Sequence, residues 1–88
     1  MTTPQSIAQW MLTQVPLSGF LGQSRVARVI RTTWGEDFVY KNKNRNWAIR
    51  PDILEAFRAL TEGQLVWSRS RQAWRRRRAG DPEGRMIR

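Results

Sequence analysis

The sequence predicts a single small α+β domain of three helices packed on antiparallel hairpins. The chain has 88 residues, 40% of them hydrophobic, which allows one domain with a small core. Three segments repeat apolar residues at helical spacing, and two pairs of short β-prone runs flank polar turns. We place the domain in residues 1–78. Residues 79–88 are rich in Gly, Pro and charge, which predicts a flexible basic tail.

The first predicted helix covers residues 4–14. Thr3 is a suitable N-cap, and Pro4 supplies a preset backbone angle at the first helical position. Pro16 and a following glycine end the helix. The apolar residues 20–21 then form a short segment between turns, and we expect them to serve packing.

The second predicted helix covers residues 25–34, with Ser24 as N-cap and Gly35 at the C-terminal end. Its apolar residues fall on one side at 100° per residue. Two interpretations fit the opposite, basic face: solvated side chains of an ordinary amphipathic helix, or guanidinium groups that bind phosphates in a planar fork. That face carries Arg25, Arg28 and Arg31.

Two β-prone runs, residues 38–40 and 47–49, predict an antiparallel hairpin whose turn is residues 41–46, KNKNRN. Turn formation by itself accounts for the asparagines, because Asn tolerates positive φ. Asn, Lys and Arg also hydrogen-bond base edges and phosphates, so the turn is a second possible contact. Its basic residues are Lys41, Lys43 and Arg45.

The third predicted helix covers residues 51–60 and begins with Pro51 at the first helical position. Asp52 and Glu55 lie near the positive end of its dipole. Two carboxylates disfavour contact with phosphates, so the second helix is the better candidate for a nucleic-acid groove. The expected buried stripe consists of Ile53, Leu54, Phe57 and Leu60.

Residues 65–78, LVWSRSRQAWRRRR, are the most cationic and aromatic part of the chain. We predict a strand at residues 65–67, a loop at 68–72 and a returning strand at 73–75, in preference to a helix, because a Ser-Arg-Ser-Arg repeat disfavours helix. Trp67 and Trp74 have two interpretations: core residues that anchor the hairpin, which small domains favour, or platforms for base stacking.

Charge is the strongest compositional signal. Sixteen Lys and Arg against seven Asp and Glu give a net charge of +9. Residues 69–88 hold eight basic and two acidic groups, so the excess is concentrated there. This asymmetry favours a nucleic-acid partner, an anionic membrane or a solubilising tail.

Enzyme chemistry is disfavoured because the chain has neither His nor Cys and no nucleotide-binding glycine motif. We therefore expect no catalysis, no metal, no other cofactor and no small-molecule substrate. Without an apolar run of about 20 residues or a signal peptide, we expect a cytoplasmic protein. Membrane adhesion is not expected, since no lipid anchor or exposed apolar stripe is evident.

The succession WGEDFVYKNKNRNWAI, ILEAFRALT and LVWSRSRQAWRRR resembles a family of short uncharacterised bacterial proteins, some encoded in integron gene cassettes. Residues 38–40, 44–49 and 66–75 carry the resemblance. Arg50 stands where this family usually has an acidic or Ser helix cap. The resemblance implies the architecture and carries over no activity and no catalytic residue.

Helices followed by a basic hairpin also resemble a winged helix, with residues 65–78 as the wing. About a dozen hairpin residues separate the second and third helices, however, where a helix-turn-helix has a turn of three or four.

The function predicted from these observations is non-enzymatic binding of DNA or RNA, with arginines on phosphates. The alternative is a protein-interaction module of unknown process, either a homodimer or a partner of an acidic protein. The candidate nucleic-acid-binding residues are Arg69, Arg71, Arg75, Arg76, Arg77, Arg78, Arg25, Arg28, Arg31, Lys41, Lys43 and Arg45.

Overall fold

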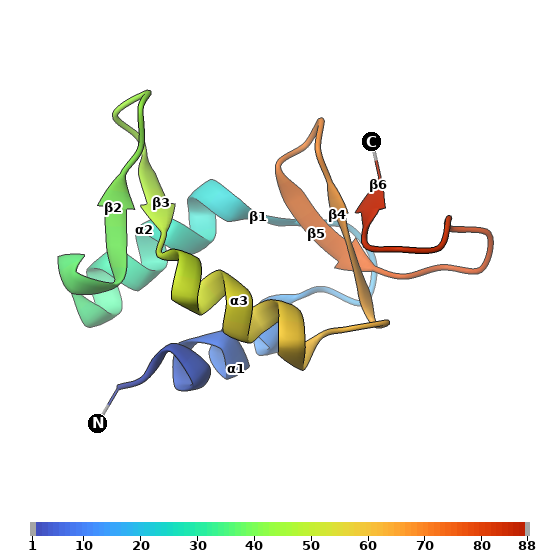
Figure 1. The fold of residues 1–88 in the computed structure, drawn as a ribbon, viewed down its shortest axis with the longest axis horizontal. Coiled ribbons are helices and arrows are strands. Elements are labelled where there is room, and N and C mark those ends of the chain that lie inside the picture. The colour runs from blue at the N-terminus through green and yellow to red at the C-terminus, as the bar shows by residue number, and fades with distance from the viewer. Residues whose placement is uncertain (1, 88) are drawn as a thin grey trace.

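A computed structural model describes residues 2–87 and confirms the α+β class. The three helices and one hairpin form one part of the molecule, and a four-stranded sheet forms the other (Figure 1). The elements in chain order are α1 (Pro4–Gln14), β1 (Leu21–Gly22), α2 (Gln23–Trp34), the 3₁₀ helix η1 (Glu36–Phe38), β2 (Val39–Lys41), β3 (Trp47–Ile49), α3 (Pro51–Leu60), β4 (Leu65–Ser68), β5 (Ala73–Arg76) and β6 (Met86–Ile87).

Helices α1 and α3 have the predicted limits because local signals fix their starts. The hydroxyl oxygen of Thr3 accepts the Ser6 backbone N–H at 3.0 Å, and Ser6 Oγ accepts the Thr3 N–H at 3.0 Å. This reciprocal capping box satisfies amides that the helix itself leaves unpaired. Pro51 occupies the first turn of α3, as predicted. The two helices pack against each other, with α1 below α3 in Figure 1.

Helix α2 begins two residues earlier than predicted, and the N-cap prediction for Ser24 is wrong. Gly22 is the N-cap and provides no side-chain hydrogen bond. The Gln23 N–H instead donates to the Gln72 carbonyl at 3.0 Å, so a distant turn satisfies the helix start. Gly35 ends the helix, as predicted, with a positive φ of 97°.

The second predicted hairpin is confirmed as β4 and β5, and the helical alternative for these residues is wrong. Strand order is β1-β5-β4-β6. The segment after α1 was expected only to pack, but Leu21 and Gly22 form β1 and pair antiparallel with Trp74 and Ala73. A two-residue strand of this kind depends on its partner, which explains why sequence pattern does not reveal it.

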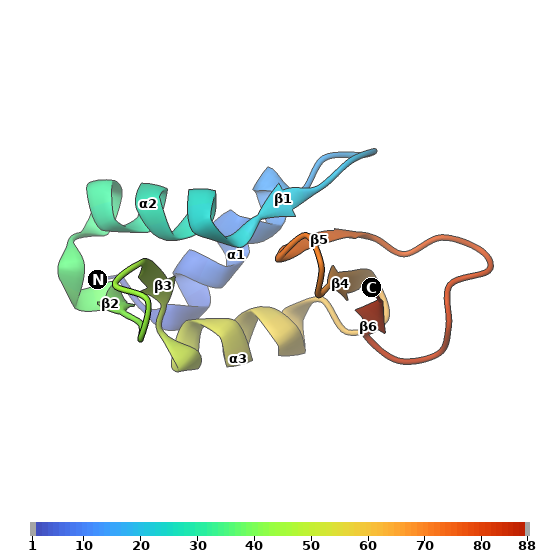
Figure 2. The same ribbon diagram turned by 90° about the horizontal axis from the view of Figure 1, so that it is seen from above.

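The described part of the predicted flexible tail, residues 79–87, returns to the hairpin. Met86 and Ile87 form β6, which pairs parallel with β4. The Trp67 N–H donates to the Arg85 carbonyl at 2.7 Å, and the Arg69 N–H donates to the Ile87 carbonyl at 3.0 Å. The sheet in Figure 2 therefore includes β6, from the returning segment, as its fourth strand.

The core lies where the three helices meet the β3 strand and one face of the sheet. Leu60, predicted to join the buried stripe of α3, is 36% exposed because it lies in the last turn of the helix. Trp74 belongs to the core at 4% exposure, whereas Trp67 is half-buried beside it. The largest fully buried apolar side chains are Phe57, Ile7, Met11, Ile30, Ile49, Ile53, Leu65, Val26 and Val66.

The first predicted hairpin is also confirmed, with Phe38 in η1 just before β2 instead of in the strand. It lies between α2 and α3 and so prevents the tight turn of a helix-turn-helix. In Figure 1 the β2–β3 and β4–β5 hairpins project to the same side of the molecule. The start of α2 lies between them, and this arrangement positions the candidate site.

Candidate nucleic-acid interface

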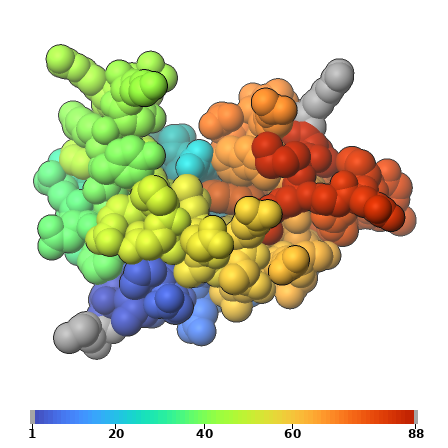
Figure 3. Space-filling view, in the orientation of Figure 1, coloured from blue at the N-terminus to red at the C-terminus, as the bar shows by residue number. Residues whose placement is uncertain are grey.

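A groove of about 580 Å³ lies between the turns of the two hairpins. The space-filling view shows this hollow between the green β2–β3 hairpin and the orange β4–β5 hairpin (Figure 3). Its floor is the start of α2. The described residues that line it include no Asp or Glu; they are Gln23, Ser24, Arg28, Asn42, Asn44, Arg45, Asn46, Trp47, Ala48 and Gln72.

The β2–β3 turn is held by the side chain of Asn42. Its Oδ1 accepts the backbone N–H groups of Asn44 at 2.9 Å and Asn46 at 3.1 Å. The residue with positive φ is Arg45, at 62°, and not an asparagine as the sequence suggests. Asn42 therefore serves the turn, and the exposed side chains of Asn44, Arg45 and Asn46 face outward from it.

The β4–β5 turn contributes Gln72 to the groove. Gln72 adopts a positive φ of 51°, and its side-chain amide donates to the Arg69 carbonyl at 2.8 Å. Arg69 and Arg71 are exposed. The Arg71 guanidinium lies 4.6 Å from the centroid of the Phe20 ring, a cation–π contact that fixes it close to the sheet.

Helix α2 directs its predicted basic residues to different places. Arg28 is exposed and lines the groove. Arg31 is 3.6 Å from the Glu36 carboxylate and lies 4.4 Å above the Trp47 ring, so its charge is partly matched. Arg25 lies against a different hollow, near the end of α1. The structure therefore brings only Arg28 of the three to the groove.

Lys41 and Lys43 are exposed on the β2–β3 hairpin. Lys41 also lies over the Trp47 ring, with its amine 5.2 Å from the ring centroid. Both lysines contribute positive potential near the groove without lining it.

Three residues of the C-terminal arginine run, Arg75, Arg76 and Arg77, make hydrogen bonds within the protein. Arg75 is only 8% exposed and donates two hydrogen bonds to the Asp81 carboxylate, at 2.7 and 3.0 Å. Those bonds, with the backbone N–H of Arg78, lower the pKa of Asp81 to about 2. The bidentate pair holds the segment after Arg78 against the hairpin.

The next two arginines are also engaged inside the protein. Arg76 is half-buried and donates to the Val15 carbonyl at 3.5 Å. Arg77 donates to the carbonyls of Pro82 and Gly84, which lie in the returning segment. Of the four consecutive arginines only Arg78 is exposed. The sequence could not reveal these hydrogen bonds, because the acceptors are backbone carbonyls of residues that are distant in sequence or lie in the predicted flexible tail.

Two further observations concern other classes of site. Within residues 2–87, no group of three or more His, Cys, Asp or Glu side chains is arranged to hold a metal ion. The helices of this described part are also too short and too polar to cross a membrane.

Comparisons with curated proteins and with solved structures find no match to this chain. One family model does match, and it covers residues 3–76, from the N-cap of α1 to the end of β5. The matched segment includes both hairpins and all three helices, and the family has no established activity. The expectation that the chain belongs to an uncharacterised family is therefore confirmed: it is a member of the family of unknown function DUF6953.

Proposed function

We propose that this protein is a small non-enzymatic nucleic-acid-binding protein that holds phosphate groups in the groove between its two hairpins. The observation that most supports this proposal is the set of residues that line one groove. Arg28 of α2 and Arg45 of the β2–β3 turn line one concave surface, although they are far apart in sequence, and Gln72 of the β4–β5 turn also lines it. Lys43, Arg69 and Arg71 are exposed on the same two hairpins and add positive charge near the groove.

The chemistry of the groove suits a polyanion. Arg28 and Arg45 supply forked guanidinium donors for phosphate oxygens, and no lining carboxylate among the described residues opposes them. Amide side chains both donate and accept hydrogen bonds, as base edges require. Gln23, Asn44, Asn46 and Gln72 provide such groups in the groove. The first turn of α2 has no acidic residue, so its positive dipole end adds to the attraction.

An anisotropy titration across salt tests the proposal. Labelled single-stranded and duplex DNA and RNA are titrated with protein between ~50 and ~200 mM salt, where several phosphate contacts weaken binding by orders of magnitude. We expect the logarithm of the affinity to fall linearly with the logarithm of the salt concentration. Absence of binding to all four probes at the lowest salt contradicts the proposal.

Matched variants locate the site. In the double variant Arg28→Gln, Arg45→Gln, the salt slope should become shallower by about 1.8 for duplex DNA or about 1.4 for single strands, the values for two lost phosphate contacts. Arg78→Gln removes an exposed arginine that does not line the groove, and it should leave the slope unchanged. Loss of slope in Arg78→Gln alone would place the contact on the C-terminal arginine run instead.

The motif resemblance also indicates the kind of organism from which the protein comes. We infer a bacterial, cytoplasmic protein whose relatives include products of integron gene cassettes. The genomic context of its gene tests the origin, and fractionation of the native host tests the compartment.

A further inference from the structure

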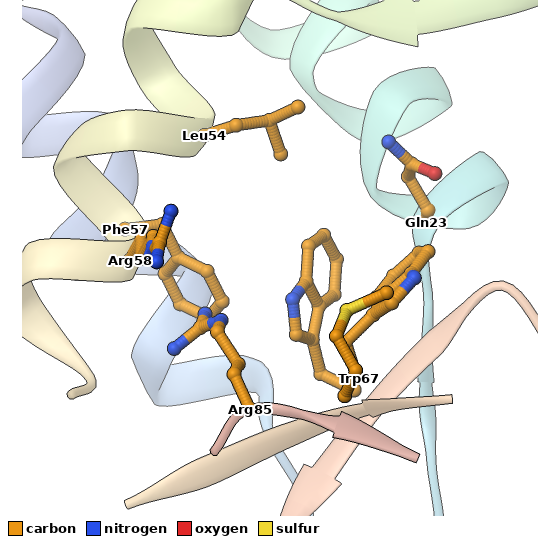
Figure 4. Close-up of a pocket in the computed structure, with 8 residues that line it drawn as sticks. Gln23, Leu54, Phe57, Arg58, Trp67 and Arg85 are labelled. Carbon is orange, nitrogen blue, oxygen red and sulfur yellow. The ribbon is translucent and has the colours of Figure 1, made fainter. Parts of the chain in front are cut away.

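A second cavity, of about 320 Å³, lies between α3 and the sheet. Figure 4 shows it in close-up. It shares only Gln23 with the groove between the hairpins, so it is a separate site. Its volume is at the lower end of the range for small-molecule pockets. The described residues that line it are Gln23, Leu54, Phe57, Arg58, Trp67, Trp74, Arg85 and Met86.

The walls of this cavity are largely aromatic. The rings of Trp67 and Trp74 have centroids 4.8 Å apart, and the Trp74 and Phe57 rings meet edge to face at 5.1 Å. These mutual contacts fix the rings before any ligand arrives. Leu54 and Met86 complete an apolar lining, and Met86 is 51% exposed at the opening.

Two arginines give the cavity a positive side. In Figure 4, Arg58 and Arg85 lie on the same side of the cavity, opposite Gln23. Arg85 is half-buried, and its guanidinium donates to the Thr61 hydroxyl at 3.1 Å. That hydroxyl in turn donates to the Phe57 carbonyl at 2.7 Å, so a buried hydrogen-bond chain orients Arg85.

Arg85 carries its positive charge at a partly buried position. Burial, and then the charges of Arg58 and Arg77, lower the pKa of Arg85. Glu62 opposes this lowering, and it lies with Glu83 in a neighbouring hollow that Arg58 and Arg85 also line. None of the described cavity residues is acidic. An anion bound between the two guanidinium groups would relieve the repulsion between them.

We propose that this cavity binds a small organic anion: a carboxylate attached to a compact aromatic body, with the carboxylate between Arg58 and Arg85 and the ring against Trp67 and Trp74. A planar carboxylate matches the guanidinium fork. A single negative charge also suits a site that is otherwise apolar, because a phosphate dianion loses more hydration on entry. The cavity volume limits the ligand to about one substituted ring.

A pair of probes that differ in charge tests this inference. 4-Ethylbenzoate and neutral 4-ethylbenzamide are titrated into the labelled full chain, and the indole N–H signals of Trp67 and Trp74 are followed by NMR. For ligands of this size we expect a Kd on the order of 1 mM for the benzoate. The benzamide should bind at least about tenfold more weakly, since it lacks charge-assisted hydrogen bonds.

Variants assign the two parts of the site. Arg58→Gln lies on an exposed helix position and should weaken benzoate binding about tenfold while leaving benzamide binding unchanged. Arg85→Gln should do the same, and Leu54→Phe should weaken both probes by filling the cavity. Arg78→Gln is the matched control and should bind both probes like the original chain.

Three results would overturn the inference. They are equal affinity for benzoate and benzamide, unchanged benzoate binding in Arg58→Gln, and no shift of either indole signal up to about 10 mM benzoate, a concentration well above the expected Kd. The double variant Arg28→Gln, Arg45→Gln should keep its benzoate affinity, so failure of the nucleic-acid proposal and failure of this one are distinguishable.

Discussion

Replacement of Trp74 by alanine tests the part of the fold on which both sites depend. Trp74 is 4% exposed and pairs with Leu21 on one side and Trp67 on the other. It therefore joins β1, β5 and β4. Its ring also meets Phe57 of α3 at 5.1 Å, which connects the sheet to the helices.

The expected loss follows from this environment. Truncation of a buried Trp or Phe to Ala costs about 3–5 kcal/mol. The aromatic cavity beside Trp74 opens to solvent at Met86, so water can fill part of the space, and we expect the lower half of that range, about 3–4 kcal/mol. For a domain of this size the total stability is about 4–13 kcal/mol. Trp74→Ala should therefore lower Tm by roughly 12–30 °C or leave the chain unfolded.

Urea unfolding followed by circular dichroism measures the effect, with a thermal melt as a second readout. Trp67→Ala is the matched control, because the Trp67 side chain is also an indole but is only half-buried. This substitution should lower the free energy of unfolding by only about 1–2 kcal/mol. Trp74→Phe should keep most of the ring contacts and lose less than Trp74→Ala. A loss below about 1 kcal/mol for Trp74→Ala would refute the assignment of this ring to the core.

Two further predictions concern the returning segment and the β2–β3 turn. Asp81→Asn removes the carboxylate held by Arg75, so the Trp67 and Arg69 amides, which donate to residues 85 and 87, should exchange faster with solvent in NMR hydrogen exchange. Acid should also speed the exchange of these amides in the original chain. The pKa of Asp81 in the folded protein is about 2, below its usual 3.8. The stability that its ionised carboxylate contributes is therefore complete above pH ~4 and is lost as pH falls toward 2. Amide protection that is unchanged in Asp81→Asn contradicts this role. Asn42→Ala removes the acceptor of two turn amides and should cost about 1 kcal/mol, measured by thermal melt against Asn44→Ala, whose side chain does not hold the turn.

Elements with local signals could be predicted from the sequence. Thr3 and Pro4 fix the start of α1, and Pro51 fixes the start of α3, because caps and proline angles act within one turn of the chain. The start of α2 could not be predicted in the same way. The backbone N–H of its first residue donates to the Gln72 carbonyl, almost fifty residues away, instead of to the side chain of an N-cap residue.

The candidate site was predicted in part. Arg28 and Arg45 were singled out by sequence, and the fold brings them to one groove. Arg75, Arg76 and Arg77 look like an exposed cluster in sequence, but Arg75 is buried and the other two are half-buried. Because side chains alternate along a strand, Trp74 faces the core and Arg75 faces the opposite side of the sheet. On that side, Arg75 donates to the Asp81 carboxylate instead of facing solvent. The contribution of Gln23 and Gln72 to the groove and the aromatic cavity were missed, because their residues come from separate segments.

The pairing of β1 with β5 has a consequence for how the chain folds. β5 lies between β1 and β4, and its partner β1 comes from near the opposite end of the chain. Forming this pair closes a long loop, whereas α1, α2 and α3 form within local stretches. We therefore expect the helices to acquire structure first and the sheet to set the rate of folding. Slowed refolding in a Leu21→Ala variant, measured by stopped-flow fluorescence of the tryptophans, would mark β1 as part of the folding nucleus.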